Sequence, residues 1–202
     1  ALTLASGSGA VTVDGAIGSG TALTSLTVND AGSGTIQIPN IGTSSAAGVT
    51  GATAIGNTST GTLTLDGTVY NTGGDQTYVA AAGGGNIDIT GAATFTTSAD
   101  AIAFNTSGVD LGANVTITTG KGTNAGTVSF GGAIEAGTAG QETLTIDSGS
   151  GNVTFSGAIG LTNALGGLNV NATAGDGAGV ITFSGDIGAV SYTHLTLPTN
   201  DQ

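Results

Sequence analysis

The sequence predicts an all-β fold in which the chain winds into a β-solenoid of about seven coils. Three observations predict it: the composition cannot fill an ordinary globular core, short strands alternate apolar and polar residues, and a unit of about 24–28 residues recurs along the chain. In a solenoid each unit buries its apolar side only against its neighbours, which suits a chain with few large side chains.

The composition also excludes several classes of function. The 202 residues include 39 glycines, whereas charged residues make up 7% and aromatic residues 4%. The formal net charge is −12 and the chain has a single Lys or Arg, so nucleic acid is excluded as a partner, because phosphate binding needs clustered Lys and Arg. There is no Cys. No apolar run approaches the length of a membrane-spanning helix, so this segment is not expected to insert into a membrane.

Short strands with period-two alternation are the local signal. Each clear example has an apolar residue on either side of a Thr: Val11–Val13, Leu26–Val28, Leu144–Ile146 and Val153–Phe155. Such alternation turns one side chain inward and the next outward. Gly, Asn and Asp cluster between the strands and tolerate positive φ at sharp corners. No stretch sustains helical periodicity, so no helix is expected.

The strongest internal repeat aligns residues 2–30 with residues 144–172 without a gap, at 17 identical positions of 29. The shared motif reads Val-Thr-(Val/Phe)-x-Gly-Ala-Ile-Gly and then Ala-Leu-x-x-Leu-x-Val. The turn position recurs at Gly15, Pro39, Gly67, Gly91, Gly132, Gly157 and Gly185. One interval, from Gly91 to Gly132, is much longer than the others, and we expect it to hold one coil plus an insertion.

Stacked coils pair each strand with its equivalents about 4.8 Å above and below, so like residues should form ladders. We expect two ladders inside the solenoid: Phe130, Phe155 and Phe183 in one, and Ile17, Ile134, Ile159 and Ile187 in the other. About seven coils give a rod roughly 35 Å long. The alternative fold is a string of tandem β-sandwich modules, but these need about 80–100 residues each, and the shorter period favours the solenoid.

Residues 190–202 differ from the rest of the chain. They contain its only His, His194, and one of its two prolines. The stretch 190–199 resembles the translation of a transposon-end adapter used in short-read sequencing libraries. We therefore interpret residues 190–202 as an adapter-derived tail, and residues 1–189 as a repetitive β-solenoid fragment truncated at both ends. His194 is accordingly given no catalytic or metal-binding role.

The repeated motifs, together with the run Leu63-Thr64-Leu65-Asp66-Gly67, resemble the β-strand repeats of very large bacterial exoproteins of the filamentous haemagglutinin and autotransporter-passenger type. The resemblance covers nearly all of residues 1–189. It implies a right-handed parallel β-helix on the outside of a bacterial cell, held at the outer membrane through other regions. The implied role is a stalk or adhesin scaffold without catalysis, whose partner is an unidentified surface, glycan or host protein.

Calcium binding is the first alternative function. Residues 83–89, Gly-Gly-Gly-Asn-Ile-Asp-Ile, approach the pattern of calcium-binding nonapeptide repeats, in which turn carbonyls and aspartates of successive coils surround the ion. Those sites require tandem copies of the nonapeptide, and this copy stands alone. An ordinary Gly-Asn turn is the favoured interpretation.

Binding to ice, a carbohydrate or another ordered surface is the second alternative. Four segments would each present two outward hydroxyls around an inward Leu or Ile: 25–27, 62–64, 116–118 and 143–145. A flat array requires this pattern on every coil, yet the equivalent position at 167–169 reads Gly-Leu-Asn. Thr is also simply a favourable outward residue of a strand.

A polysaccharide-degrading β-helix enzyme is the third alternative. Asp14, Asp66 and Asp186 lie near corners that the repeat makes equivalent, and could form a row of carboxylates. Aspartate is common at Asp-Gly turns, and residues 1–189 contain no Arg, His or Cys to accompany it. We therefore assign no catalytic, cofactor-binding or metal-ligating residue. Five Asn-x-Ser/Thr sequons are expected by chance in this composition: Asn57, Asn105, Asn114, Asn152 and Asn171.

Overall fold

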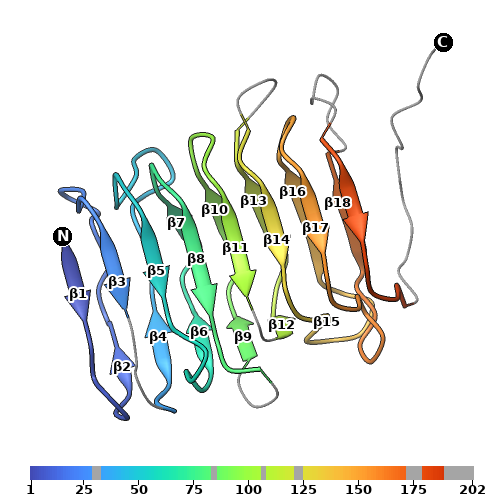
Figure 1. Cartoon of the computed structure of the whole chain (residues 1–202), viewed down its shortest axis with the longest axis horizontal. Coiled ribbons are helices and arrows are strands. Elements are labelled where there is room, and N and C mark those ends of the chain that lie inside the picture. Colours follow the sequence, from blue (N-terminus) through green and yellow to red (C-terminus); the bar gives the residue numbers. More distant parts are fainter. Residues whose placement is uncertain (29–32, 83–85, 106–107, 121–124, 172–178, 189–202) are drawn as a thin grey trace.

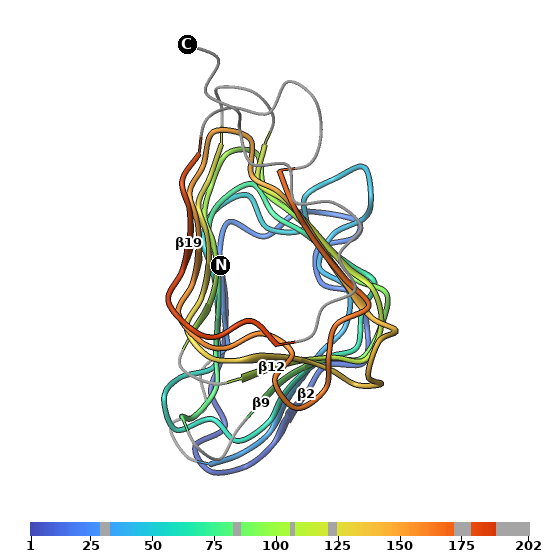
Figure 2. The same cartoon turned by 90° about the vertical axis from the view of Figure 1, so that its right-hand side faces the viewer.

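In the described residues, three parallel β-sheets surround one interior, and the chain visits them in a constant order, although the first two coils have no strand in the third sheet and the last coil has none in the second (Figure 1). The computed structural model describes residues 1–28, 33–82, 86–105, 108–120, 125–171 and 179–188. We name the sheets A, B and C in the order in which the chain meets them. Seen from the C-terminal end in Figure 2, the chain runs counterclockwise through A, B and C while the coils advance toward the viewer. The fold is thus the predicted right-handed parallel β-helix.

The strands are short and are hydrogen-bonded to equivalents one coil away. Within the described residues, sheet A has eight strands: β1 (Leu2–Leu4), β3 (Leu26–Val28), β5 (Thr53–Ile55), β8 (Gln76–Val79), β11 (Ile102–Asn105), β14 (Val128–Phe130), β17 (Val153–Phe155) and β19 (Ile181–Phe183). The part of sheet B that the structure describes has six: β2 (Val11–Thr12), β4 (Ile36–Ile38), β6 (Leu63–Leu65), β9 (Asn86–Ile89), β12 (Gly108–Leu111) and β15 (Ile134–Ala136). Sheet C, as far as its residues are described, has five: β7 (Val69–Asn71), β10 (Thr94–Thr96), β13 (Val115–Thr118), β16 (Thr143–Asp147) and β18 (Gly167–Val170).

The register of sheet A sets the length of each coil. Equivalent positions in its eight strands are Leu2, Leu26, Thr53, Gln76, Ile102, Val128, Val153 and Ile181. The chain therefore takes roughly 25 residues to complete one coil, which is an ordinary period for a solenoid. Sequence alternation explains the strands, because the apolar residues of β3, β4 and β17 are buried on both sides of a half-buried polar residue.

Aromatic side chains stack along the inside of sheet A, as predicted for Phe130, Phe155 and Phe183. The ring centroids of successive members lie 4.9–5.4 Å apart, with nearly parallel planes, and the ladder continues back through Phe104 to Tyr78. A shorter stack in sheet C joins Tyr70 to Phe95 at 4.6 Å, and Phe95 meets Phe104 edge-on at 5.3 Å. The two stacks therefore pack against each other and connect sheet A to sheet C across the interior.

The isoleucine ladder was predicted correctly in part. Ile134, Ile159 and Ile187 pair in successive coils along sheet B. Ile17 does not join them, because it pairs with Ile41, which in turn pairs with Tyr70 of sheet C. The prediction for Ile17 was wrong because the Gly-Ala-Ile-Gly motif occupies a different corner in the first coil from the one it occupies near the C-terminus.

The same change of corner explains the long interval between Gly91 and Gly132. The prediction that this interval holds an insertion was wrong. Gly91 follows a strand of sheet B, whereas Gly132 follows a strand of sheet A, so the interval spans one coil and two further sides. The steps of sheet A in this region, from Gln76 to Ile102 and from there to Val128, are equal in length and similar to its other steps. The coils here have ordinary length.

Candidate functional site

A row of three acidic side chains lies on the outer face of sheet B. Asp88 of β9, Asp110 of β12 and Glu135 of β15 occupy the same outward register position in three successive coils. We call these three residues the acidic ladder. Each lies between two inward apolar residues, so strand alternation alone projects all three carboxylates onto one face.

Two members of the acidic ladder have hydrogen-bond donors beside them. Asn86 donates its side-chain N–H to Asp110 Oδ2 at 2.6 Å. Glu135 Oε2 accepts the backbone N–H groups of Thr162 and Asn163, at 3.1 and 2.8 Å. Partial burial and the neighbouring charge of Asp110, in that order, raise the pKa of Asp88 above its ordinary value. The paired carboxylates of the acidic ladder therefore repel one another. The hydrogen bonds that Asp110 and Glu135 accept offset part of this repulsion.

The segment that suggested calcium is mostly strand where the structure describes it. Residues 83–85 lie outside the described residues, and Asn86–Ile89 forms β9, with Asp88 in the middle of the strand and not at a turn. Among the described residues, no three His, Cys, Asp or Glu side chains converge in a way that could hold a metal ion. The arrangement therefore differs from the turn-based ligand set of a calcium nonapeptide repeat.

The hydroxyl pairs that suggested an ordered array fall on three different faces. Leu26 belongs to sheet A, Leu63 to sheet B, and the 116–118 and 143–145 segments to sheet C. Sheet C does stack Thr94 and Thr96 directly on Thr116 and Thr118, but the next coil supplies Thr145 and Asp147. The predicted segments therefore do not build a single array, and the Thr94–Thr96 pair was missed.

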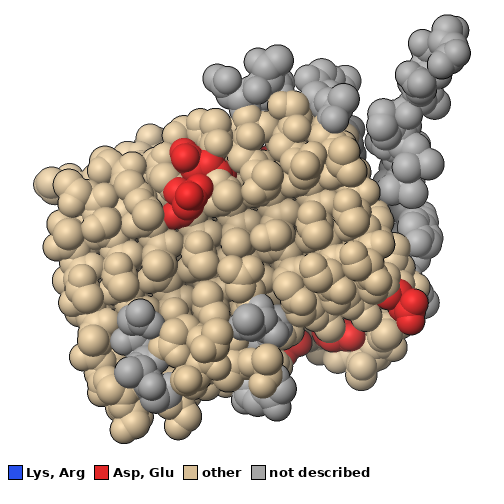
Figure 3. All heavy atoms as spheres, viewed as in Figure 1, with Lys and Arg blue, Asp and Glu red and all other residues tan. Residues whose placement is uncertain are grey.

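The outer face of sheet A carries a longer row of small uncharged residues. Along its central register the outward residues are Thr3, Thr27, Ala54, Thr77, Ala103, Ser129, Thr154 and Thr182. We call this row the hydroxyl row. Figure 3 looks onto this face: the acidic side chains lie toward its upper and lower borders and leave the middle free of charge. A flat neutral surface of this kind could lie against another flat, uncharged surface.

The structure brings together two of the three aspartates that were predicted to form a carboxylate row. Asp14 and Asp66 line one shallow open hollow together with Asn40, at the turn between sheets B and C. Gln37 donates a hydrogen bond to Asp66 Oδ2 at 2.6 Å. Asp186 lies elsewhere, because it follows a strand of sheet A and precedes the sheet B position Ile187. The inclusion of Asp186 was wrong for the same reason as that of Ile17.

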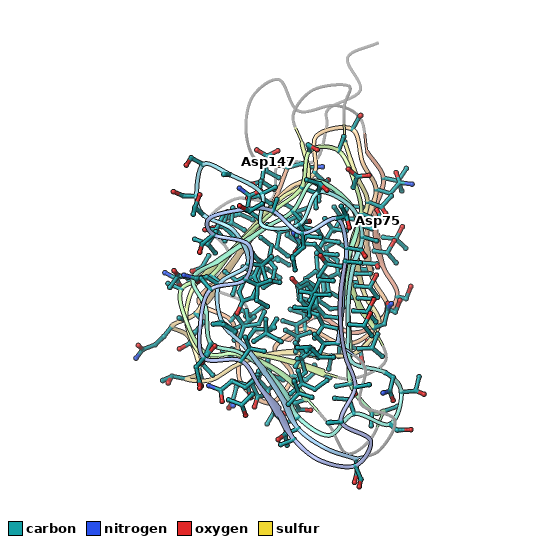
Figure 4. The ribbon with its side chains drawn as sticks, turned by 90° about the vertical axis from the view of Figure 1, so that its left-hand side faces the viewer. Asp75 and Asp147 are labelled. Carbon is teal, nitrogen blue, oxygen red and sulfur yellow. The ribbon has the colours of Figure 1, made fainter. Side chains whose placement is uncertain are left out.

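Asp75 and Asp147 both lie at the corner between sheets C and A (Figure 4). Asp75 precedes β8, and its Oδ1 accepts the backbone N–H of Ala101 in the next coil at 2.8 Å. Its backbone carbonyl accepts the N–H of Thr53 in the coil before. Asp75 therefore joins three coils, which is a structural role for a carboxylate that sequence reasoning had not singled out.

Several sequon asparagines also connect coils. Asn114 Oδ1 accepts the N–H of Thr143 at 2.9 Å, and Asn152 Oδ1 accepts the N–H of Val180 at 2.9 Å. Asn171, at a positive φ of 47°, accepts the N–H of Ser148 in the preceding coil. These side-chain amides satisfy backbone donors at corners where the sheet ladder is interrupted.

Comparison of the chain with protein-family models, with curated proteins and with solved structures finds no match in any of the three. Within the part of the chain that the structure describes, there is also no helix of the length and hydropathy that crossing a bilayer would require. The fold and the surface features above therefore carry the functional argument alone.

Proposed function

We propose that this chain is a structural repeat segment of a large secreted or cell-surface bacterial protein, serving as a stalk or adhesin scaffold without catalysis. The observation that carries the proposal is the regular stacking of coils, since sheet A continues through eight strands of the described residues, each with at least one inward apolar residue. Each coil contacts mainly its neighbours, so length can be added without redesigning a core.

The surface features support a passive scaffold. The outward residues of sheets A and C are mostly Thr, Ser, Ala and Asn, and the carboxylates that do cluster sit on an outer strand face or in a shallow hollow. Hydrolysis of a polysaccharide needs carboxylates that converge across a cleft. The net charge of −12 suits a protein that must remain soluble outside the cell.

Surface display tests this proposal. The chain would be inserted once, twice or three times in tandem between an outer-membrane anchor and an epitope tag, and tag height measured by immunogold electron microscopy. Seven coil steps of about 4.8 Å predict an increase of about 34 Å per insert. A compact tag position that does not change with the number of inserts would contradict the stalk proposal, provided that protease protection shows the inserts to be folded.

A second candidate, contact with an ordered neutral surface, is favoured by the hydroxyl row. Six of its eight positions are Thr or Ser, and no charged residue interrupts them. The purified chain would be tested for co-sedimentation with insoluble neutral polysaccharides and for inhibition of ice recrystallisation. Thr77→Lys and Thr154→Lys should abolish any such binding, whereas Asp88→Asn on sheet B should leave it intact. Binding that survives both Lys substitutions would rule out the hydroxyl row.

A further inference from the structure

Asp66 and Gly67, at the turn between sheets B and C, form a pair that is chemically labile when the backbone is free to move. The backbone nitrogen of Gly67 attacks Cγ of Asp66, and the bond between Cγ and the carboxyl hydroxyl breaks. That hydroxyl leaves as water with the proton of the nitrogen, which closes a succinimide ring. Water then opens the ring at either carbonyl and yields aspartate or isoaspartate, with no net change in mass. Glycine permits the attack best, because no Cβ crowds its nitrogen.

The packing of the coils requires glycine at position 67. A Cβ there would lie 2.6 Å from the backbone nitrogen of Asn40 in the coil before. The next coil is also close, since a Cβ at Gly91 would lie 3.1 Å from the carbonyl oxygen of Gly67. Only glycine allows backbones to approach in this way. The stacked fold therefore imposes a glycine after Asp66, and with it the chemical liability.

Other side chains hold both reacting groups of this pair. The N–H of Gly67 donates to the hydroxyl oxygen of buried Tyr70 at 2.8 Å. That hydroxyl donates in turn to the backbone carbonyl of Ile38 at 3.1 Å. The carboxylate of Asp66 accepts a hydrogen bond of 2.6 Å from the side-chain nitrogen of Gln37 in the coil before. Because nitrogen and Cγ must meet in one aligned geometry, the ring can close only after these hydrogen bonds open.

The next coil separates the role of the Tyr70 ring from that of its hydroxyl. Phe95 occupies the position of Tyr70 in sheet C and stacks on it, with ring centroids 4.6 Å apart. The stack therefore needs the ring and not the hydroxyl. The coil of Phe95 has Thr90 where the coil of Tyr70 has Asp66, so it lacks the carboxyl group that the reaction consumes. Of these two coils, the hydroxyl is present in the one that carries the labile pair.

We propose that Asp66–Gly67 is a site of backbone isomerisation that the folded chain keeps unreactive. The Tyr70 hydroxyl protects the attacking nitrogen, and Gln37 holds the carboxylate that would be attacked. The unfolded chain has neither contact, so the site reacts there and is protected once the coils have stacked. This inference goes beyond the stalk proposal and rests only on the contacts of this corner.

Isoaspartate at position 66 would damage the stack, because it adds one carbon atom to the backbone. The N–H groups of Thr68 and Val69, which follow the pair directly, both donate to Oδ1 of Asn40 in the coil before, at 2.7 and 3.0 Å. A longer backbone would displace these donors and the start of β7 with them. Protection of the pair therefore preserves the register between two coils.

The rate of isoaspartate formation at position 66 tests the proposal. The full chain would be incubated at neutral pH and physiological temperature, either folded or in guanidinium chloride. Isoaspartate would be quantified by enzymatic methylation and assigned to the site by mass spectrometry of peptic peptides. The folded wild-type chain should react more slowly than the unfolded chain. Tyr70→Phe should raise the rate in the folded chain roughly two- to tenfold, which is the factor that loss of one hydrogen bond supplies.

A second variant and two controls separate protection of the site from general stability. Gln37→Ala frees the carboxylate from outside the core and should also raise the rate. Tyr78→Phe removes another buried tyrosine hydroxyl, the one that donates to Gln76 at 2.8 Å, and should react at the wild-type rate. Asp66→Thr introduces the residue of the next coil and should give no isoaspartate at this position. Far-UV circular dichroism spectra would show that each variant is folded.

Three results would each overturn the proposal. A folded wild-type chain that reacts as fast as the unfolded chain would show that the fold does not protect the pair. Wild-type rates in both Tyr70→Phe and Gln37→Ala would show that neither side chain holds the reacting groups apart. An equal rise in Tyr78→Phe and Tyr70→Phe would show that the reaction follows general loosening of the solenoid and not the contacts of Gly67.

Discussion

Tyr78 donates a hydrogen bond of 2.8 Å from its phenolic hydroxyl to the side-chain oxygen of Gln76, inside the solenoid at the start of the aromatic ladder. The side-chain nitrogen of Gln76 donates to the backbone oxygens of Tyr70 and Thr96 and lies 3.1 Å from the hydroxyl of Thr72. One fully buried amide therefore ties β8 of sheet A to two strands of sheet C.

Removal of either partner of this pair should destabilise the chain. Tyr78→Phe keeps the ring stack but leaves the oxygen of Gln76 without that donor, at an expected cost of about 1–3 kcal/mol. Gln76→Leu should cost more, because it also removes the side-chain donor from the buried carbonyl of Tyr70 and from the partly buried carbonyl of Thr96. The double variant should cost less than the sum of the two. Urea midpoints would measure this, and strict additivity would show that the two side chains act independently.

The buried tyrosines predict a loss of stability in alkali. Burial raises the pKa of both Tyr70 and Tyr78 above the ordinary value of 10.0. The unfolded chain releases these protons near pH 10 whereas the folded chain retains them, so their contribution to stability is complete below that pH and is lost as pH rises above it. Urea midpoints should be constant from pH 8 to 9 and fall above pH 10. The Tyr70→Phe/Tyr78→Phe variant should lack the fall, and an unchanged pH profile would contradict this account.

Repulsion within the acidic ladder predicts a stabilising substitution. Asp88→Asn removes one of two like charges at paired positions of sheet B and should raise stability by about 0.2–1 kcal/mol at pH 7 in low salt. The gain should shrink in 0.5 M salt. Because the pKa of Asp88 is raised in the folded state, the penalty is present above that pKa and disappears as pH falls below the unfolded value near 3.9. Asp186→Asn, at an exposed turn, is the matched control and should change little.

The coil, its length and its inward residues could be predicted because they depend on local pattern. Alternation around Thr154 or Thr27 determines which side chains turn inward, and the regular spacing of the motif determines that coils stack. Stacking of Phe130 on Phe155 then follows directly. None of these inferences requires knowledge of which sheet a given strand joins.

The assignment of strands to sheets could not be predicted from the repeat. The aligned segments 2–30 and 144–172 begin in sheet A and sheet C respectively, since Leu2 belongs to β1 and Leu144 to β16. Their later strands are displaced by one face in the same direction, with β2 in sheet B against β17 in sheet A. The three sides of a coil are similar enough in length and inward chemistry that one motif fits more than one of them.

The acidic ladder was missed for a related reason. The acidic ladder places one carboxylate in each of three successive coils: Asp88, Asp110 and Glu135. The recurring turn position passes from Gly91 directly to Gly132, so no turn in the coil of Asp110 marks its place. Alignment of the central residue of each apolar-x-apolar triplet would have brought the three together. A row of this kind can be found in the sequence only when each strand of a coil, and not the whole coil, is taken as the repeating unit.

Substitutions at Gly157 and Gly15 test whether the two aligned segments lie on different faces of the solenoid. The repeat aligns these two glycines, but the structure gives them different surroundings. A Cβ at Gly157 would lie 2.2 Å from the carbonyl carbon of Gly132 in the coil before, whereas a Cβ at Gly15, in the first coil, meets nothing within 4 Å. Backbone cannot move aside as a side-chain end can, so Gly157→Ala should cost about 1–3 kcal/mol or more.

Gly15→Ala should leave stability unchanged or raise it by up to about 1 kcal/mol, through the reduced entropy of the unfolded chain. Urea midpoints of the two variants would be compared with that of Gly185→Ala, whose Cβ would lie 2.4 Å from the carbonyl carbon of Gly157. Gly157→Ala and Gly185→Ala should behave alike, because the glycines stack at the corner between sheets A and B. Equal midpoints for Gly15→Ala and Gly157→Ala would mean that Gly157 does not rest on Gly132, and that the coils at this corner have a different register.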